Sequence, residues 1–333
     1  MLKSILCLIL SIVVLQTAKA ENSDTLTVYY KNSGQKVSTK DSADYYRIIL
    51  PPDTNVDKDL YRVYDYYFNG QPKMLATSLT KENGLVLDGT CISYFANGKR
   101  KSTAQFKNGR YVGSITNYYP NGKLYNILKV EDLSRDYYRG YYYGYLSDPS
   151  IGYDVKVTEL RDSVGKLMVL NGTGHVVVFD DDFKKVLRQG DLKNNKKDGE
   201  WRGAIADSGK YICIFHRDEL KSGESYMKSG NHYTFKQIDV KAVFSDGMEA
   251  FSAFIKKNLQ YPESARKHKV AGTVMVGFYV EINGTVSEVK VTRALFKSLD
   301  DEAMRVIALS PLWIPATQFG VPTRTFYTIP VNF

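Results

Sequence analysis

The hydrophobic residues in the first two thirds of the chain alternate with a period of two, the spacing of half-buried β-strands. Aromatic and β-branched residues form short runs, and glycine-containing turns separate the runs. Tyrosine-led Asn-Gly turns at 67–70, 94–98 and 119–122 recur about every 24 to 28 residues. Further Asn-Gly pairs at 83–84 and 108–109 lie between them, and Asn-Gly readily adopts the positive φ values of a tight hairpin. The pattern predicts a meander of antiparallel hairpins.

Weaker copies of this unit continue along the chain, at 171–179, 190–201 and 215–226. The tyrosine-rich stretch 131–145 breaks the phase and is interpreted as a junction between two repeat arrays. Its tyrosines fit a half-buried β surface, with a stacking platform for a sugar or a peptide as the alternative.

Near residue 245 the pattern changes to helical spacing, with Phe251, Phe254, Ile255 and Leu259 on one face. Asp246 and Glu249 have the spacing of a capping box, and a short helix is expected from Pro262 to His268. Strands follow at 273–281 and 286–292, joined by an Asn-Gly turn.

A second long helix is expected to begin at Ser298, capped with Asp301, and to end before Pro311. The last strand covers 323–333. The expected fold is therefore a mainly β repeat region of antiparallel hairpins, followed by an α+β domain with a small antiparallel sheet and two helices.

Composition and net charge limit the classes of partner that the protein is expected to bind. The 333 residues are 43% hydrophobic and 24% charged, which suits several packed cores. The net charge of +9 is spread out, with no basic stretch that carries interleaved arginine and aromatic residues, so no nucleic-acid partner is expected. A basic protein is attracted to anionic surfaces, which favours peripheral association with a cell envelope.

The first twenty residues resemble an export signal. Lys3 precedes an apolar run at 5–15, and Ala18-Lys19-Ala20 is an A-x-A cleavage pattern. The run is shorter than the roughly 20 residues that span a bilayer. Residues 1–20 are therefore predicted to be a cleaved signal peptide of a periplasmic protein, with an uncleaved inner-membrane anchor as the alternative.

Catalytic and metal-binding patterns are weak. Cys91 and Cys213 are far apart in the sequence and lack C-x-x-C spacing. Both a disulfide bond between them and two free buried thiols stay open. The four histidines form no H-x-x-x-H or H-x-H pair. Acidic runs at 180–182 and 300–302 fit a hairpin turn and helix-cap charges better than catalytic pairs. We expect no enzyme activity, no metal and no cofactor.

The turns at 67–70, 94–98 and 119–122, with the glycine turns between them, resemble MORN-variant repeats over about residues 61 to 126. Repeats of this family are mostly extended β scaffolds and interaction surfaces, and no catalytic residue accompanies them. The resemblance implies a first repeat region at 21–145 and a second, degenerate one at 146–243.

The last ninety or so residues resemble the TonB carboxy-terminal domain. The resemblance depends on motifs in the family's order: Tyr261-Pro262-x-x-Ala265, Gly272-Thr273-Val274, Asn283-Gly284, Ala303, Trp313-x-Pro315-Ala316 and Ile329-Pro330-Val331-x-Phe333. It implies a periplasmic domain at 244–333 that engages outer-membrane transport receptors. In the family, a short receptor peptide, the TonB box, adds to the sheet as another strand, in the service of energy-dependent transport.

Pro330 places the last strand at an edge, because proline within sheets is confined to edges, ends and bulges. A strand-adding peptide needs such an edge. The predicted peptide-binding residues are Arg324, Thr325, Phe326, Tyr327 and Thr328. Arg324 is expected to contact an acid on the peptide. The alternative is an edge that proline protects from aggregation.

The sequence departs from an energy transducer resembling TonB, because a long membrane anchor and a proline-rich spacer are not recognisable and only 10 prolines are present. A binding or adaptor role is therefore favoured. In the alternative, the protein is a structural component of the envelope whose repeats carry the binding and whose terminal domain serves docking or homodimer formation. The receptor, the solute and the oligomeric state stay open.

Overall fold

The computed structural model describes residues 25–53, 55, 57–81, 84–130 and 155–333. The predicted signal peptide and the tyrosine-rich junction lie outside the described residues. The described residues form two compact units. One comprises the residues up to Gly122 together with Val130, and the other comprises Lys123–Lys129 and the residues from 155 onward. Each unit is described by itself.

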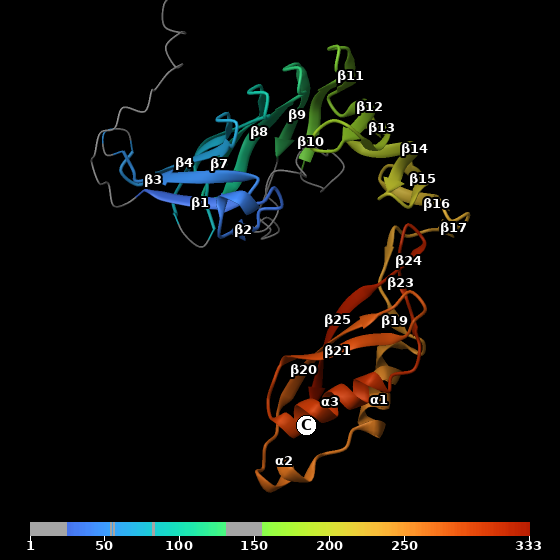
Figure 1. The fold of residues 1–333 in the computed structure, drawn as a ribbon. Helices are drawn as coiled ribbons and strands as arrows, with labels where there is room; N and C mark the ends of the chain where they lie inside the picture. The colour runs from blue at the N-terminus through green and yellow to red at the C-terminus, as the bar shows by residue number, and fades with distance from the viewer. Residues whose placement is uncertain (1–24, 54, 56, 82–83, 131–154) are drawn as a thin grey trace, which may run out of the picture. The chain divides into compact units, whose positions relative to one another are not determined.

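The first unit is a meander of antiparallel strands (Figure 1). Each strand from β3 to β7 pairs with the next along the chain, β1 pairs with both β2 and β3, and one turn of 3-10 helix covers Lys40–Ser42. The strands are β1 (Leu26–Tyr30), β2 (Lys36–Val37), β3 (Tyr45–Leu50), β4 (Tyr61–Tyr67), β5 (Pro72–Ser78), β6 (Gly89–Tyr94), β7 (Arg100–Lys107) and β8 (Arg110–Tyr118).

The Asn-Gly turns are of two kinds. Between β7 and β8, Asn108 and Gly109 both have positive φ, at 49° and 76°, as a two-residue hairpin requires. In the tyrosine-led turns only the glycine has positive φ, as at Gly98. There the asparagine acts through its side chain: Asn97 accepts the backbone N–H of Lys99 and donates to the carbonyl of Pro120 in the next repeat. Asn69 donates in the same way to Ala96. The repeated asparagine thus joins successive turns.

The second unit begins with another meander, in which β9 pairs with β10 and each later strand up to β17 pairs with its predecessor. The aspartate run 180–182 lies in the turn between β12 and β13, as predicted. The strands are β9 (Leu124–Val130), β10 (Val155–Arg161), β11 (Leu167–Leu170), β12 (Thr173–Phe179), β13 (Val186–Lys193), β14 (Lys196–Ile205), β15 (Gly209–His216), β16 (Glu219–Met227) and β17 (His232–Phe235).

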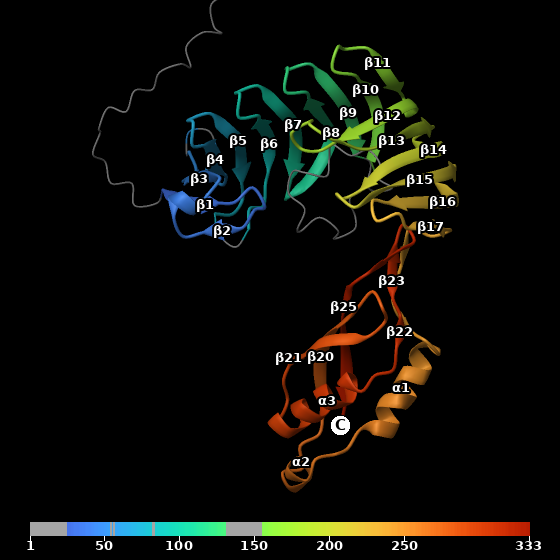
Figure 2. The same ribbon diagram turned by 45° about the vertical axis from the view of Figure 1, so that its right-hand side comes forward.

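The C-terminal part of this unit is an α+β domain in the predicted element order. Its three-stranded antiparallel sheet has the order β21-β20-β25, and α3 packs against β20 and β21 (Figure 2). The elements are α1 (Gly247–Asn258), α2 (Glu263–Lys267), β20 (Thr273–Val280), β21 (Val286–Arg293), α3 (Lys297–Ala308) and β25 (Thr325–Asn332). A mainly β repeat region and a C-terminal α+β domain are both confirmed.

The helix starts differ from the prediction. Asp246 is the N-cap of α1, but its side chain makes no capping hydrogen bond. The first residue of α3 is Lys297, and Phe296 takes the N-cap position in place of Ser298. The hydroxyl of Ser298 instead accepts a hydrogen bond from Ser264. The predicted capping boxes are therefore wrong: Asp246 makes no capping bond, and Ser298 and Asp301 bond to Ser264 and Lys297 instead.

Short strands that the sequence pattern missed complete the domain. They pair as β18 with β23, β23 with β24, and β19 with β22. Two to three residues are too few to show any periodicity, so tertiary pairing alone defines them. They are β18 (Asp239–Val240), β19 (Val243–Phe244), β22 (Trp313–Ile314), β23 (Ala316–Gln318) and β24 (Val321–Thr323).

The turn between β23 and β24 contacts the second repeat array within the same unit. Phe319 stacks on the ring of Tyr211, with centroids 4.1 Å apart, and lies edge-on to Phe235. The fully buried hydroxyl of Ser225 donates to the carbonyl of Phe319 over 2.7 Å. The hairpin tip of the C-terminal domain is therefore packed against the last strands of the array.

An ion pair between the buried Glu302 and the partly exposed Arg305 joins α3 to the segment that follows α1. The Glu302 side chain, 9% exposed, accepts two hydrogen bonds from Arg305, at 2.6 and 2.7 Å, and one from the backbone N–H of Gln260. Arg305 also donates to the carbonyl of Asn258. Burial by itself raises the pKa of Glu302, but the hydrogen bonds from Arg305 and Gln260 outweigh it, so the net pKa is lowered.

We expect Glu302→Gln to destabilise the C-terminal domain by about 2 kcal/mol at pH 7, because charge-assisted hydrogen bonds to a buried carboxylate are lost. The advantage of ionised Glu302 is complete above its unfolded pKa and disappears as the pH falls through its lower folded pKa. The difference between variant and parent should therefore shrink as the pH falls through that lowered pKa of Glu302. The measurement is the urea midpoint of Trp313 fluorescence in a Trp201→Phe background. Glu263→Gln, which alters an exposed pair with Lys267, is the control and should change little.

Candidate functional site

The last strand, β25, lies at the edge of its sheet, as predicted from Pro330. All eight of its residues pair with β20, from Thr325 opposite Val280 to Asn332 opposite Thr273. Within the part of the chain that the structure describes, no strand pairs with its other side. One side of β25 is therefore available to an added strand.

The register decides which backbone groups face that open side. Gly272 and Phe333 exchange two hydrogen bonds, at 2.9 and 3.1 Å, so they form a hydrogen-bonded pair. Bonded and non-bonded pairs alternate in an antiparallel ladder, and the register has no shift here. The N–H and C=O groups of Phe326, Thr328 and Asn332 therefore point away from β20. Pro330 shares this phase and offers only its carbonyl.

The predicted binding residues accordingly divide into two sets. Thr325 and Tyr327 direct their backbone groups toward β20, and the Tyr327 hydroxyl donates to the carbonyl of Ala242 over 2.9 Å. Burial raises the pKa of Tyr327. Phe326 and Thr328 are exposed and direct their backbone groups outward. Only this second set presents free strand-pairing groups.

The exposed ring of Phe326 lies over Gly277 in the central strand. A Cβ atom at residue 277 would be only 2.5 Å from this ring and 2.8 Å from the methyl group of Thr292. Tyr279 flanks the ring with centroids 5.0 Å apart, and the Lys290 ammonium lies 5.4 Å from its centre. The absence of a side chain at Gly277 lets the phenyl ring lie against the sheet and leave the open edge clear.

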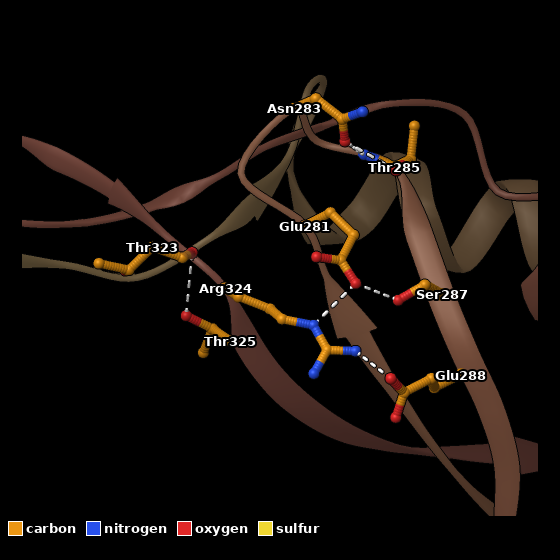
Figure 3. A network of polar contacts seen from close by, with 8 residues as sticks. All are labelled: Glu281, Asn283, Thr285, Ser287, Glu288, Thr323, Arg324 and Thr325. Atoms are coloured by element: carbon orange, nitrogen blue, oxygen red, sulfur yellow. Dashed lines mark hydrogen bonds and ion pairs between the residues drawn. The ribbon is translucent and has the colours of Figure 1, made fainter. Parts of the chain in front are cut away.

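Arg324, just before β25, is the centre of a polar network on the same domain (Figure 3). Its Nε donates to Glu281 over 2.8 Å, and its Nη2 donates to Glu288. The guanidinium also lies 3.5 Å from the centre of the Tyr279 ring, a cation–π arrangement. Glu281 accepts a further hydrogen bond from Ser287. Arg324 is thus held by two acids of its own chain.

The sequence interpretation missed Glu281, Glu288 and Tyr279 as neighbours of Arg324. The two glutamates flank the Asn283-Gly284 hairpin turn, and this closeness in sequence was a usable signal. Their convergence on a residue some 40 positions later depends on the pairing of β20 with β25, which the sequence pattern alone does not specify.

The other candidate chemical groups have structural partners. His175, His216 and His232 lie beside acidic side chains, and His268 lies 2.8 Å from the carbonyl of Ser264. Cys91 and Cys213 are buried and form no disulfide with each other, and burial raises the pKa of Cys213 to about 11. Over the described ranges, no group of His, Cys, Asp and Glu side chains is arranged to hold a metal ion. Within those same ranges, no helix has the length and apolar character needed to cross a membrane.

Comparison with known families agrees with the geometry. Residues 257–333 match the family described as Gram-negative bacterial TonB protein C-terminal. Residues 87–108 and 111–131 match the MORN repeat variant. Both resemblances inferred from the sequence motifs, and their order along the chain, are confirmed. Searches of the curated proteins and of the solved structures returned no match to this chain.

The network around Arg324 predicts a measurable titration. Hydrogen bonds from Ser287 and then Arg324 lower the pKa of Glu281 below its ordinary value of 4.5. We expect Ser287→Ala and Arg324→Gln each to raise this pKa, as measured by carboxyl NMR titration. Thr285→Ala is the control, since that hydroxyl bonds to Asn283 and not to Glu281. The stabilisation from ionised Glu281 is present above pH 4.5 and is lost as the pH falls through the lower folded value. A pKa that does not respond to either variant would contradict the network.

Proposed function

We propose that this chain is a periplasmic, TonB-like binding protein of the cell envelope. Its C-terminal domain captures an extended segment of an outer-membrane transport receptor by strand addition. The observation that carries the proposal is the open side of β25, where Phe326, Thr328 and Asn332 direct outward backbone groups that no described strand pairs with. The match of residues 257–333 to the TonB C-terminal family supports the identity of the partner.

The edge sets the length of segment that can pair. Outward groups recur at every second residue, about 7 Å apart along a strand. Phe326 and Thr328 each offer a donor and an acceptor, whereas Pro330 offers an acceptor only. Full pairing is therefore interrupted at Pro330, and a segment of about five residues covers the well-formed part of the edge. The exposed Phe326 ring adds apolar contact for a side chain of the bound segment.

Arg324 can select for charge while it keeps its internal partners. Its Nε and Nη2 bond to Glu281 and Glu288, and within the described residues its Nη1 has no hydrogen-bond partner. An acid on the bound segment that reached Nη1 would complete the guanidinium fork. Two carboxylates already hold the side chain in place, so less rotamer entropy is lost when the peptide binds.

The repeat arrays give the whole chain the role of an adaptor in this proposal. The packing of Phe319 on Tyr211 attaches the C-terminal domain to the second array, so a partner of the arrays and a partner of β25 would be linked through one chain. Export through residues 1–20 places that chain in the periplasm. Energy transduction requires, in addition, that those residues remain as an anchor.

The outward phase of β25 is tested by substituting one backbone donor. Thr328→Pro removes an N–H that faces the open side and leaves the bonds to β20 intact, as Pro330 already does two residues later. We expect this variant to bind receptor segments at least tenfold more weakly. The measurement is calorimetric titration with synthetic peptides from the periplasmic segments of the source bacterium's outer-membrane receptors. Thr328→Val keeps the N–H and should bind normally; equal losses in both variants would contradict strand addition.

The peptide offers a complementary test. In an antiparallel or parallel added strand, only alternate residues of the peptide direct their N–H groups toward β25. We expect N-methylation at one set of alternate positions to abolish binding and methylation at the other set to be tolerated. Equal sensitivity at all positions would mean that side-chain contacts, and not main-chain pairing, hold the segment. Gel filtration of the free protein shows whether a second copy already occupies the edge.

A further inference from the structure

The first repeat array contains an open cavity of about 520 Å³, which is separate from the β25 edge and from the Arg324 network. Two adjacent tyrosine-led turns form its walls. Its lining residues are Tyr94, Lys99, Arg100, Tyr118, Asn121 and Gly122. The volume is within the range of small-molecule sites, and the lining contains two cations and no acid. Its charge therefore favours an anionic occupant.

The cation that distinguishes this cavity is Arg100. It begins β7, directly opposite Tyr94 on β6. Within the described parts of the chain, its guanidinium has no hydrogen bond and no ion pair. Lys99, by contrast, donates from its ammonium to the carbonyl of Asn121 over 2.9 Å and so helps to join the two turns. Arg100 is left with a full planar fork of donors, which matches a carboxylate or a phosphate group.

The repeat itself does not require this arginine. The residue two positions after the turn glycine is Pro72 in the preceding repeat and Leu124 in the following one. The scaffold thus accepts an apolar residue at this position on either side. An unpaired arginine between two such repeats is explained better by a ligand than by the fold.

The two tyrosines supply the second element of recognition. Tyr94 and Tyr118 occupy equivalent positions, four residues before the turn glycine, and both are partly exposed. The equivalent Tyr66 is covered, because it stacks on Tyr46 with ring centroids 5.6 Å apart. Within the described residues, neither Tyr94 nor Tyr118 stacks on another ring or bonds through its hydroxyl. Each therefore offers an apolar face and a free polar tip.

We propose that this cavity binds an anionic saccharide, a sugar ring that carries a carboxylate or phosphate group. Arg100 pairs with the acid, the faces of Tyr94 and Tyr118 contact the ring, and their hydroxyls exchange hydrogen bonds with the hydroxyls of the sugar. This gives the repeat array a ligand of its own, independent of the peptide edge on β25. The adaptor would then have one contact to a charged glycan and another to a receptor.

The test is calorimetric and NMR titration of the full chain with glucuronic acid and glucose 6-phosphate, alongside neutral glucose and inorganic phosphate. We expect the charged sugars to bind and both single-feature probes to bind at least tenfold more weakly. Arg100→Leu, which copies the next repeat, should weaken the charged sugars at least tenfold and leave the circular dichroism spectrum unchanged. Arg110→Leu is the matched control, an exposed arginine of the same array outside the cavity, and should bind as the parent does.

Three results would overturn the proposal. The first is no binding of either charged sugar by the parent chain, and the second is an equal loss in the Arg100 and Arg110 variants. The third is Arg100-dependent binding of phosphatidylglycerol vesicles without binding of soluble sugars, which would assign the cavity to a membrane surface. Both variants leave β25 unchanged. Peptide binding measured on the same samples therefore tests the proposed function separately from sugar binding.

Discussion

Backbone pairing between antiparallel strands is the constraint on which both parts of the structure depend. In the arrays, nearly every strand is satisfied by its neighbours in sequence, and each asparagine turn adds a bond to the next repeat, as Asn97 does to Pro120. In the three-stranded sheet of the C-terminal domain, the same pairing leaves some backbone groups without a neighbouring strand among the described residues. β20 is paired on both sides, and β25 on one side only. Among the described residues β21 also has one unpaired side, and the candidate binding edge is the unpaired side of β25.

Two charged side chains of the C-terminal domain, Glu302 and Arg324, support that framework. Glu302 is buried but has three hydrogen-bond donors, so it joins α3 to the segment after α1. Arg324 is similarly held by Glu281 and Glu288 beside the open edge. The other two acids of the run 300–302 also have local partners: Asp300 accepts the backbone N–H of Leu295, and Asp301 pairs with Lys297. Arg100 is the contrast, because its guanidinium has no such partner among the described residues.

The contact at Phe319 gives the domain a fixed neighbour. A phenylalanine with a positive φ of 50° at a hairpin tip is conformationally unfavourable, and stacking on Tyr211 with a hydrogen bond from Ser225 offsets that cost. The second array and the domain thus meet through specific packing. Binding at β25 and contacts made by the second array are consequently properties of one compact unit.

The sequence by itself determined the hairpin turns, the order of helices and strands in the last ninety residues, and the edge position of β25. These depend on local signals: Asn-Gly φ preferences, periodicity of two or 3.6, and the missing N–H of Pro330. Only the tertiary structure decided which backbone groups of β25 point to its open edge. Their alternation follows from the hydrogen-bonded pair Gly272–Phe333. The tertiary structure also decided the caps, the short strands, the partners of Arg324 and the cavity beside Arg100. Each of these depends on side chains or backbone groups that are distant in sequence and that only the folded chain brings together.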